Sequence, residues 1–281
     1  MAMSELALPV VVGIDGSQAG VDAALWAAQE AHSRGVPLRL IHVVSVDEED
    51  ADVTLGDDPA AIAADWPETE YGRTSLRNAA TTIHASGLPL TVDTDIAFGD
   101  VESTLIDESQ NATMICVGSL GIDALCWRAL GSTAATLAEQ AHAPVAVIRT
   151  PPPASADEPD WIVASVDDSP ESDAVADSAF READLRRAPV LALGLPDRRG
   201  GDRTSDELNS RVAGWRRAHP SLDIYPVCIP TDVPTFLENH RELRIQLAVI
   251  GAADVDQVPA IVGPHHQGRR LRNWCSVLVV R

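Results

Sequence analysis

Three glycines and a serine in the first half of the chain are spaced so that they could hold an anion. Gly118 and Gly121 follow an apolar segment typical of a strand, and nine residues later Gly131 and Ser132 precede a helical pattern. Glycine lets the backbone approach a ligand because it has no Cβ, and the first turn of a helix presents unpaired N–H groups at the positive end of the dipole. Ser132 could cap that helix or turn its hydroxyl to a phosphate oxygen. The spacing indicates either an anion-binding loop or an ordinary glycine-rich connection.

A carboxylate follows another strand-like segment. The apolar run 8–14 ends in Asp15-Gly16-Ser17, and a helical pattern begins shortly afterwards. Asp15 could contact a ligand, or it could form the turn before a helix that Ser17 caps. Ligands of open parallel sheets bind beyond the carboxyl ends of the strands. If the strands before Asp15 and Gly118 are neighbours, both loops face one pocket.

Short apolar runs alternate with helical patterns along the first 150 residues. Strands are expected at 8–14, 38–46, 88–96, 113–117 and 144–148. Helices are expected at 21–32, 60–86 (divided by Pro67 and Gly72), 101–110 and 133–142. This alternation predicts an α/β fold with a parallel sheet, and right-handed crossovers place helices on both of its faces. We expect the Rossmann-like, doubly wound strand order 3-2-1-4-5.

The same pattern returns after residue 160. The segment 150–160 is rich in proline and acidic residues and predicts a semi-rigid linker. Asp167-Asp168-Ser169 then repeats the earlier Asp-x-Ser turn, and Gly251 follows an apolar run as Gly118 does. The chain therefore predicts two tandem five-stranded domains, at 1–150 and 161–281, joined by the linker 151–160. Pro226 suits the edge strand of the second sheet.

The second copy of the glycine loop has different chemistry. Asp254 aligns with Gly121, and Gly263-Pro264 aligns with Gly131-Ser132. A carboxylate repels phosphate, and proline has no N–H to donate. We therefore expect that the second loop does not hold a phosphate. The adjacent His265 and His266 do not predict a metal site, because neighbouring side chains rarely face one ion and no third ligand is evident.

Composition narrows the class of partner. The formal net charge of −21 argues against nucleic acids and anionic membranes. No apolar run approaches the roughly 20 residues that span a bilayer, and the N-terminus lacks a secretory signal pattern. The four cysteines have neither metal-ligand nor CxxC spacing, which favours reduced thiols in a cytoplasmic protein.

Together these motifs resemble the universal stress proteins. The resemblance is carried by Val-Gly-Ile-Asp-Gly-Ser at 12–17, His42-Val43, the Gly-x2-Gly-x9-Gly-Ser spacing of 118–132, and Pro-Val-Ala-Val-Ile-Arg at 144–149. The glycine spacing is the signature of the family's ATP-binding subclass. The resemblance covers the whole chain as a tandem pair, but only the first copy carries the intact nucleotide motif.

The resemblance implies one ATP site, with Mg²⁺ as a candidate companion ion. The adenosine is implied to meet the backbone and carboxylate around Asp15, an adenine pocket lined by one valine, and the first two glycines of the loop. The phosphates are implied to lie on the start of the following helix. The implied site residues are Gly13, Ile14, Asp15, Val43, Gly118, Gly121, Gly131, Ser132 and Thr133.

One departure from the family pattern bears on affinity. Leu120 stands where members often have arginine or histidine, so a charge-assisted contact to phosphate is lost. We therefore predict modest rather than tight ATP binding. Arg128, within the loop, could supply the missing charge or remain in solvent.

The implied function is an ATP-binding regulator of the stress response, in which the nucleotide biases conformation or partner choice. The two domains are expected to pack as a pseudo-dimer within one chain, and two chains could associate further. No general base or arginine finger for phosphoryl transfer is evident, so no catalytic residue is predicted, although slow hydrolysis stays open. The alternatives are a nucleotide-free protein interaction module and an ATP-hydrolysing enzyme. Gly13-Ile14-Asp15-Gly16-Ser17 lacks the paired glycines of the ATP pyrophosphatase loop.

Overall fold

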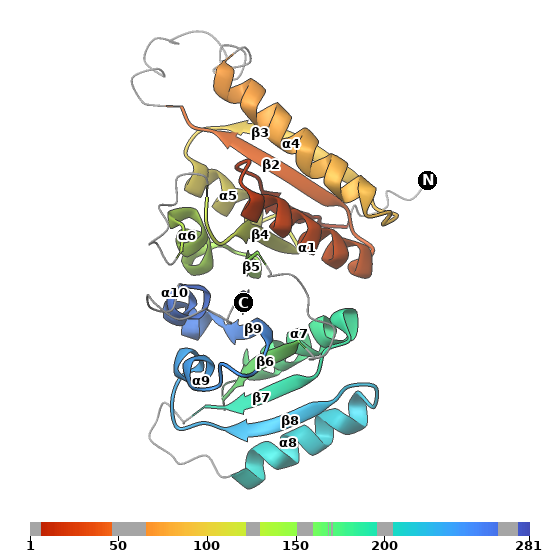
Figure 1. The fold of residues 1–281 in the computed structure, drawn as a ribbon, viewed down its shortest axis with the longest axis vertical. Helices are drawn as coiled ribbons and strands as arrows, with labels where there is room; N and C mark the ends of the chain where they lie inside the picture. Colours follow the sequence, from red (N-terminus) through yellow and green to blue (C-terminus); the bar gives the residue numbers. More distant parts are fainter. Residues whose placement is uncertain are drawn as a thin grey trace. The chain divides into compact units, whose positions relative to one another are not determined.

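The chain folds into two compact units (Figure 1). The computed structural model describes residues 7–46, 66–121, 130–150, 160–167, 169, 171–195, 205–263 and 275–281. The first unit contains the described residues up to Thr150, and the second contains those from Asp160 onward. Strands alternate with helices in both units, as the sequence predicts.

The first unit is built on a parallel sheet in the order β3-β2-β1-β4-β5. Its strands are β1 (Val10–Gly13), β2 (Leu38–Val44), β3 (Val92–Phe98), β4 (Met114–Gly118) and β5 (Val145–Ile148). Val12 pairs with Leu40 on one side and with Cys116 on the other. The predicted 3-2-1-4-5 order is confirmed for this unit, and it makes the carboxyl ends of β1 and β4 neighbours.

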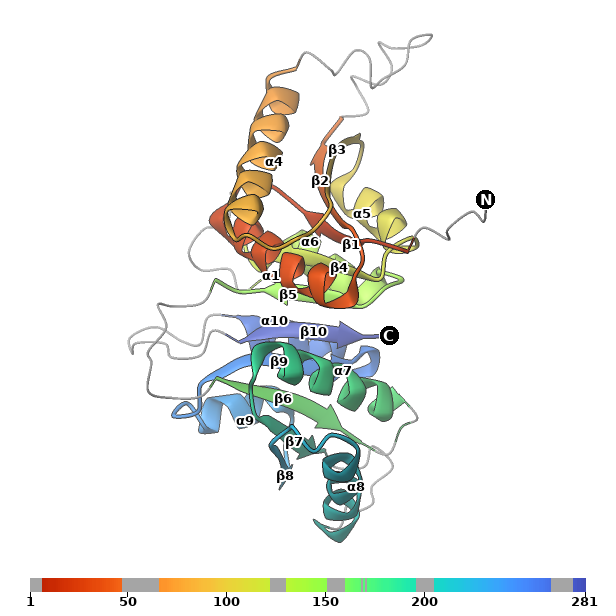
Figure 2. The ribbon, with the colours of Figure 1, turned by 90° about the vertical axis from the view of Figure 1, so that its right-hand side faces the viewer.

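Helices cover both faces of this sheet. They are α1 (Gln18–Arg34), α4 (Pro67–Ala85), α5 (Val101–Ser109) and α6 (Ser132–Gln140). α1 packs against α4, and α5 packs against α6. Figure 2 shows α4 and α5 on opposite sides of β2 and β3. Small side chains let α1 lie close to the strands, because its inner face is formed by the buried residues Ala23, Ala24, Ala27, Ala28 and Ala31.

The predicted interruption of the second helix at Gly72 was wrong. α4 runs without a break from Pro67, which the first turn of a helix tolerates, and Gly72 lies within it. A Cβ at Gly72 would overlap the imidazole ring of His42 in β2. Glycine costs about 1 kcal/mol of helix propensity relative to alanine, and here it allows close contact between helix and strand.

The third strand begins later than the apolar pattern suggests. The prediction was 88–96, whereas β3 spans Val92–Phe98 and pairs with β2 from Leu38 opposite Val92. Pro89 has no N–H for a sheet ladder. The approach to the strand is therefore irregular, and the leucines at 88 and 90 are only half-buried.

The second unit repeats this architecture in the order β8-β7-β6-β9-β10. Its strands are β6 (Trp161–Val166), β7 (Val190–Gly194), β8 (Ile224–Cys228), β9 (Ile245–Gly251) and β10 (Ser276–Val280). Its helices are α7 (Glu171–Arg186), α8 (Ser205–Ala218), α9 (Val233–Asn239), the 3₁₀ helix η1 (Ala252–Gln257) and α10 (Val258–Val262). Pro226 lies in β8, the third strand of this unit, as predicted.

A buried ion pair recurs at the same place in both units. In α1, Arg34 binds Glu30 at 3.1 Å, and in α7, Arg186 binds Glu182 at 3.1 Å. The two glutamate side chains are only 2% and 1% exposed. Each pair stands at the same sequence distance from the aspartate that follows its unit's first strand, Asp15 or Asp167. This correspondence supports a duplication at domain scale.

Candidate functional site

The loops after β1 and β4 meet at the carboxyl edge of the first sheet. A Cβ placed on Gly121 would lie 3.0 Å from Oδ2 of Asp15. The N–H of Gly131 donates a hydrogen bond of 2.9 Å to the carbonyl of Ser119, which returns the far end of the glycine loop to the end of β4. A Cβ on Gly131 would lie 3.9 Å from the backbone nitrogen of Gly121. The structure therefore brings Asp15, Gly121 and Gly131 together.

Asp15 has a structural role that leaves one carboxylate oxygen directed at the glycine loop. Its Oδ1 accepts a hydrogen bond of 2.9 Å from the N–H of Ser17. Ser17 then caps α1, because its Oγ accepts the N–H of Gly20 at 3.0 Å, and it also lies within 3.5 Å of the Leu120 carbonyl as a donor. The capping turn that the sequence suggested for Asp15 is therefore present, and its Oδ2 still faces Gly121.

The start of α6 presents backbone donors, and its N-cap residue has no side chain to accept from them. The N-cap residue is Gly131, with extended backbone (φ −69°, ψ 152°), so the option that Ser132 caps the helix was wrong. The first helical hydrogen bond runs from the N–H of Ala135 to the Gly131 carbonyl at 3.0 Å. The amides of Ser132 and Thr133 precede it and have no acceptor within the helix. An anion placed there would also meet the positive end of the helix dipole.

The glycines of the predicted site differ in what the fold requires of them. A Cβ on Gly118 would lie 2.7 Å from the carbonyl carbon of Ala19, so packing of β4 against α1 requires glycine. A Cβ on Gly13 would lie 3.2 Å from a Leu105 methyl of α5, which is also tight. At Gly131 the nearest atom would be 3.7 Å away, and its φ suits any residue. The described residues therefore leave room for a methyl group at Gly131.

The remaining predicted residues lie along the same edge. Ile14 is buried directly after β1, and its N–H donates to the Ile41 carbonyl at 2.8 Å. Val43 is half-buried near the carboxyl end of β2, one strand away from the Asp15 turn, and pairs with Ala97 of β3. Ser132 is exposed and Thr133 is half-buried in the first turn of α6.

Two further side chains contact the Asp15 turn from the α4 side. The Nδ1–H of His42 donates to the Ile14 carbonyl at 2.7 Å, and the Tyr71 hydroxyl donates to the Asp15 carbonyl at 3.3 Å. His42 was noted in the sequence only as part of the family resemblance, and Tyr71 was not identified at all. The sequence signal that could have identified them is the pair of glycines at 16 and 72. A Cβ on Gly16 would collide with Tyr71, and a Cβ on Gly72 would collide with His42.

Leu120 is half-buried after β4, and Arg128 lies outside the described residues. Within the described ranges, no group of three or more histidine, cysteine, aspartate or glutamate residues could hold a metal ion. None of the helices in these ranges is long and apolar enough to cross a membrane.

The segment after β9 does not match the predicted second glycine loop. Gly251 leads directly into η1 and α10, and Gly263 ends α10 as its C-cap, so the alignment of Gly263 with Gly131 was wrong. Asp254 is 7% exposed and accepts a hydrogen bond of 3.0 Å from Nε2 of Gln257. Helix formation with buried apolar residues replaces the open loop here. Pro264, His265 and His266 lie outside the described residues.

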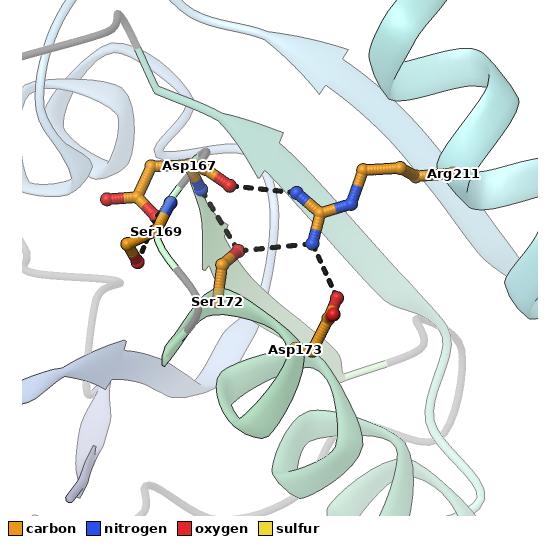
Figure 3. A network of polar contacts seen from close by, with 5 residues as sticks. All are labelled: Asp167, Ser169, Ser172, Asp173 and Arg211. Atoms are coloured by element: carbon orange, nitrogen blue, oxygen red, sulfur yellow. Dashed lines mark hydrogen bonds and ion pairs between the residues drawn. The ribbon is translucent and has the colours of Figure 1, made fainter. Parts of the chain in front are cut away.

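In the second unit, an arginine side chain donates hydrogen bonds to the residues that follow β6 (Figure 3). Arg211 of α8 donates to the Asp167 carbonyl at 2.8 Å, to the Ser172 Oγ at 3.4 Å and to the Asp173 carboxylate at 2.7 Å. Both the N–H and the hydroxyl of Ser169 donate to Oδ1 of Asp167, at 2.9 and 2.6 Å. Hydrogen bonds from Arg211 and Ser169 therefore occupy the carbonyl and Oδ1 of Asp167.

Comparisons with known proteins agree on one family. The model of the Universal stress protein family matches residues 8–149. Universal stress protein Rv2624c of Mycobacterium tuberculosis (strain ATCC 25618 / H37Rv) is 40% identical over 277 residues, which is 97% of this chain and 96% of that protein. A crystal structure of a universal stress protein from Archaeoglobus fulgidus DSM 4304 matches with a TM-score of 0.70 at 15% identity, covering 97% of this chain and 96% of that one.

A shorter structure also matches part of the chain. It is a universal stress protein from Archaeoglobus fulgidus in complex with dAMP, with a TM-score of 0.35 and 22% identity. The match covers 50% of this chain and 96% of that one.

Proposed function

The chain belongs to the universal stress protein family, and on that premise we propose that its first unit binds ATP, or a related adenine nucleotide, as a regulatory ligand. The observation that carries the proposal is the convergence of the Asp15 carboxylate, Gly121 and the start of α6, whose N-cap residue is Gly131. The carboxylate can accept hydrogen bonds from ligand hydroxyls, and the backbone N–H groups at the start of α6 can donate to an anion. A nucleoside phosphate has both requirements.

The phosphates would lie at the start of α6. The amides of Ser132 and Thr133 and the exposed Ser132 hydroxyl supply donors there. A Cβ at Gly131 would make only ordinary contacts, with the Ser119 carbonyl oxygen at 3.7 Å and the Gly121 nitrogen at 3.9 Å, so the described packing does not require glycine at this position. A phosphate that lies close to the backbone would explain why this position has glycine, which has no Cβ in the way.

The Asp15 carboxylate would face the ribose rather than the phosphates. A carboxylate repels phosphate but accepts hydrogen bonds from ribose hydroxyls, as acidic residues do in dinucleotide-binding folds. Its Oδ2 is directed at Gly121, between the end of β1 and the glycine loop. We assign the adenine to the region beside Ile14 and Val43, the apolar residues at the ends of β1 and β2.

Charge limits the expected affinity. Residues 1–150 contain 22 acidic residues and 6 arginines, and Leu120 replaces a cation common at that position. Repulsion of a triphosphate predicts modest binding that strengthens when Mg²⁺ accompanies the nucleotide. Mg²⁺ would be held largely by phosphate oxygens and water, as is usual for this ion.

We assign the nucleotide a regulatory role. The loops after β1 and β4 already touch through Ser17 and Leu120, and a ligand that contacts both would favour the arrangement it binds best. Such a ligand could change which protein partner the first unit accepts.

Calorimetric titration of nucleotide-free protein with ATP and Mg²⁺ tests the proposal. We expect saturable binding by the wild type and a large loss of affinity in Gly131→Val, since the branched side chain would occupy the proposed phosphate position, while its Cβ would make only ordinary contacts with the described residues. Gly251→Ala, at the end of β9 with 3.7 Å to the nearest atom, is the control and should bind normally. Absence of wild-type binding at millimolar ATP would favour the nucleotide-free interaction module. Rapid, saturable release of phosphate would favour the enzyme.

A further inference from the structure

We infer that His42 and Tyr71 are positioning residues of the nucleotide site, holding the Ile14 and Asp15 carbonyls so that the Asp15 carboxylate points at the ligand. The inference rests on the proposed function. It gives a role in ligand binding to one residue of β2 and one of α4, both of which contact the backbone of the Asp15 turn.

His42 fixes the first of the two peptides. Its side chain is 9% exposed, and Nδ1 lies 2.7 Å from the Ile14 carbonyl. A carbonyl can only accept, so Nδ1 carries the proton in this contact. The Cδ2 edge of the ring packs on Gly72 of α4, where any Cβ would overlap it. The ring is therefore held on both sides, and it holds Ile14 in turn.

Tyr71 fixes the second peptide. Its hydroxyl donates to the Asp15 carbonyl at 3.3 Å, although its side chain is 47% exposed. Gly16 makes this contact possible, because a Cβ there would overlap the Tyr71 hydroxyl and lie 2.7 Å from the Ser75 Oγ. Gly16 also has a φ of +90°, which side chains rarely adopt. The tyrosine and histidine rings meet edge to face at 6.1 Å between centroids.

These contacts control the direction of the carboxylate. Oδ1 of Asp15 is already bound to the N–H of Ser17, so rotation of the Ile14–Asp15 backbone would carry the whole carboxylate with it. Oδ2 faces Gly121, and a Cβ on that residue would lie only 3.0 Å from it. Holding the two carbonyls in place removes an ordering cost that a ligand would otherwise meet on binding.

The second unit provides a contrast at the equivalent carbonyl. There Arg211 holds the Asp167 carbonyl at 2.8 Å and also binds Ser172 and Asp173 (Figure 3). Ser169 directs both its donors at Asp167 Oδ1, whereas the Ser17 hydroxyl is turned to the Leu120 carbonyl. In the first unit, by contrast, a tyrosine hydroxyl holds the Asp15 carbonyl, and Oδ2 of Asp15 is directed at Gly121 of the glycine loop.

Three variants separate positioning from simple stability. Tyr71→Phe removes one exposed hydroxyl and should fold normally. His42→Leu removes the donor to Ile14, while His42→Asn places an amide N–H where Nδ1 stood. Each protein is titrated with ATP and Mg²⁺ by calorimetry, and its unfolding midpoint is measured with and without the nucleotide.

We expect Tyr71→Phe to weaken ATP binding by about threefold to tenfold, the effect of one lost hydrogen bond, without changing the midpoint of the nucleotide-free protein. His42→Leu should weaken binding more, and His42→Asn should recover most of the loss. Wild-type affinity in both Tyr71→Phe and His42→Leu would overturn the inference while leaving the proposed function intact. Failure of the wild type itself to bind would instead overturn the proposed function.

Discussion

Oδ2 of Asp15 lies so close to Gly121 that a single methyl group on the glycine would stand 3.0 Å from it. The two residues belong to different loops, one after β1 and one after β4, and they meet because these strands are neighbours in the sheet. The contact links the acidic side chain of the site to its glycine loop. Its tightness makes the site sensitive to changes of one carbon atom.

Gly121→Ala should displace the Asp15 carboxylate. The added methyl group leaves too little space for Oδ2, and the side chain must rotate or the loop must shift. We expect ATP to bind about tenfold more weakly, equivalent to about 1.4 kcal/mol, with little change in the unfolding midpoint of the nucleotide-free protein. Calorimetric titration measures the affinity. Unchanged binding would show that the direction of the carboxylate does not matter.

Gly118→Ala should act on stability. Its Cβ would lie 2.7 Å from the carbonyl carbon of Ala19, so either β4 or the start of α1 must move. Overpacking of this kind costs about 1–3 kcal/mol. The matched control is Gly251→Ala at the end of β9, where the nearest atom is a Val175 methyl at 3.7 Å. Thermal unfolding should show a lower midpoint for Gly118→Ala alone, and equal midpoints would contradict the packing assignment.

Arg211→Leu should loosen the second unit without affecting nucleotide binding. The substitution removes the hydrogen bonds from Arg211 to Asp167, Ser172 and Asp173. Loss of such bonds costs about 1–3 kcal/mol. Hydrogen exchange should become faster in peptides covering the end of β6 and the start of α7. Weaker ATP binding in this variant would contradict the assignment of the nucleotide to the first unit.

Asp232 should contribute a pH-dependent part of the stability. It caps α9, and hydrogen bonds from the Thr235 hydroxyl and N–H lower the pKa of its carboxyl below the ordinary value of 3.8. The folded pKa is the lower one, so the contribution is complete above pH 3.8 and is lost as pH falls through the folded pKa. Asp232→Ala should lose about 1 kcal/mol at neutral pH.

The difference between Asp232→Ala and the wild type should shrink in acid. Urea unfolding at several pH values measures it, and Asp232→Asn is the control because its amide oxygen accepts the same hydrogen bond without titrating. A difference that stayed constant down to pH 2 would remove the carboxylate from the explanation.

The order of elements could be read from the chain because it follows from local pattern. Apolar runs such as 8–14 and the Ser17 helix cap depend only on neighbouring residues. Parallel sheets with right-handed crossovers then leave few topologies. The pairing of β1 with β4, and so the meeting of the two loops, followed from that order.

The errors arose where distant residues decide local structure. Gly72 signals a helix break by propensity, yet it lies within α4 because the His42 ring needs the space. Gly263 resembles Gly131 in spacing, but it ends a helix, because the residues before it form η1 and α10. Spacing records distance along the chain and does not record whether the intervening residues coil or extend.

By itself, the sequence determined the α/β architecture, the tandem repeat, the family and the loops at which a nucleotide site should be sought. Only the tertiary structure decided which glycine the packing requires, since a Cβ on Gly118 would lie 2.7 Å from Ala19, while one on Gly131 would make only ordinary contacts from 3.7 Å. It also revealed His42 and Tyr71 behind the Asp15 turn. The physical reason is that periodicity and capping depend on near neighbours, whereas close contacts depend on how β2 and α4 pack against the end of β1.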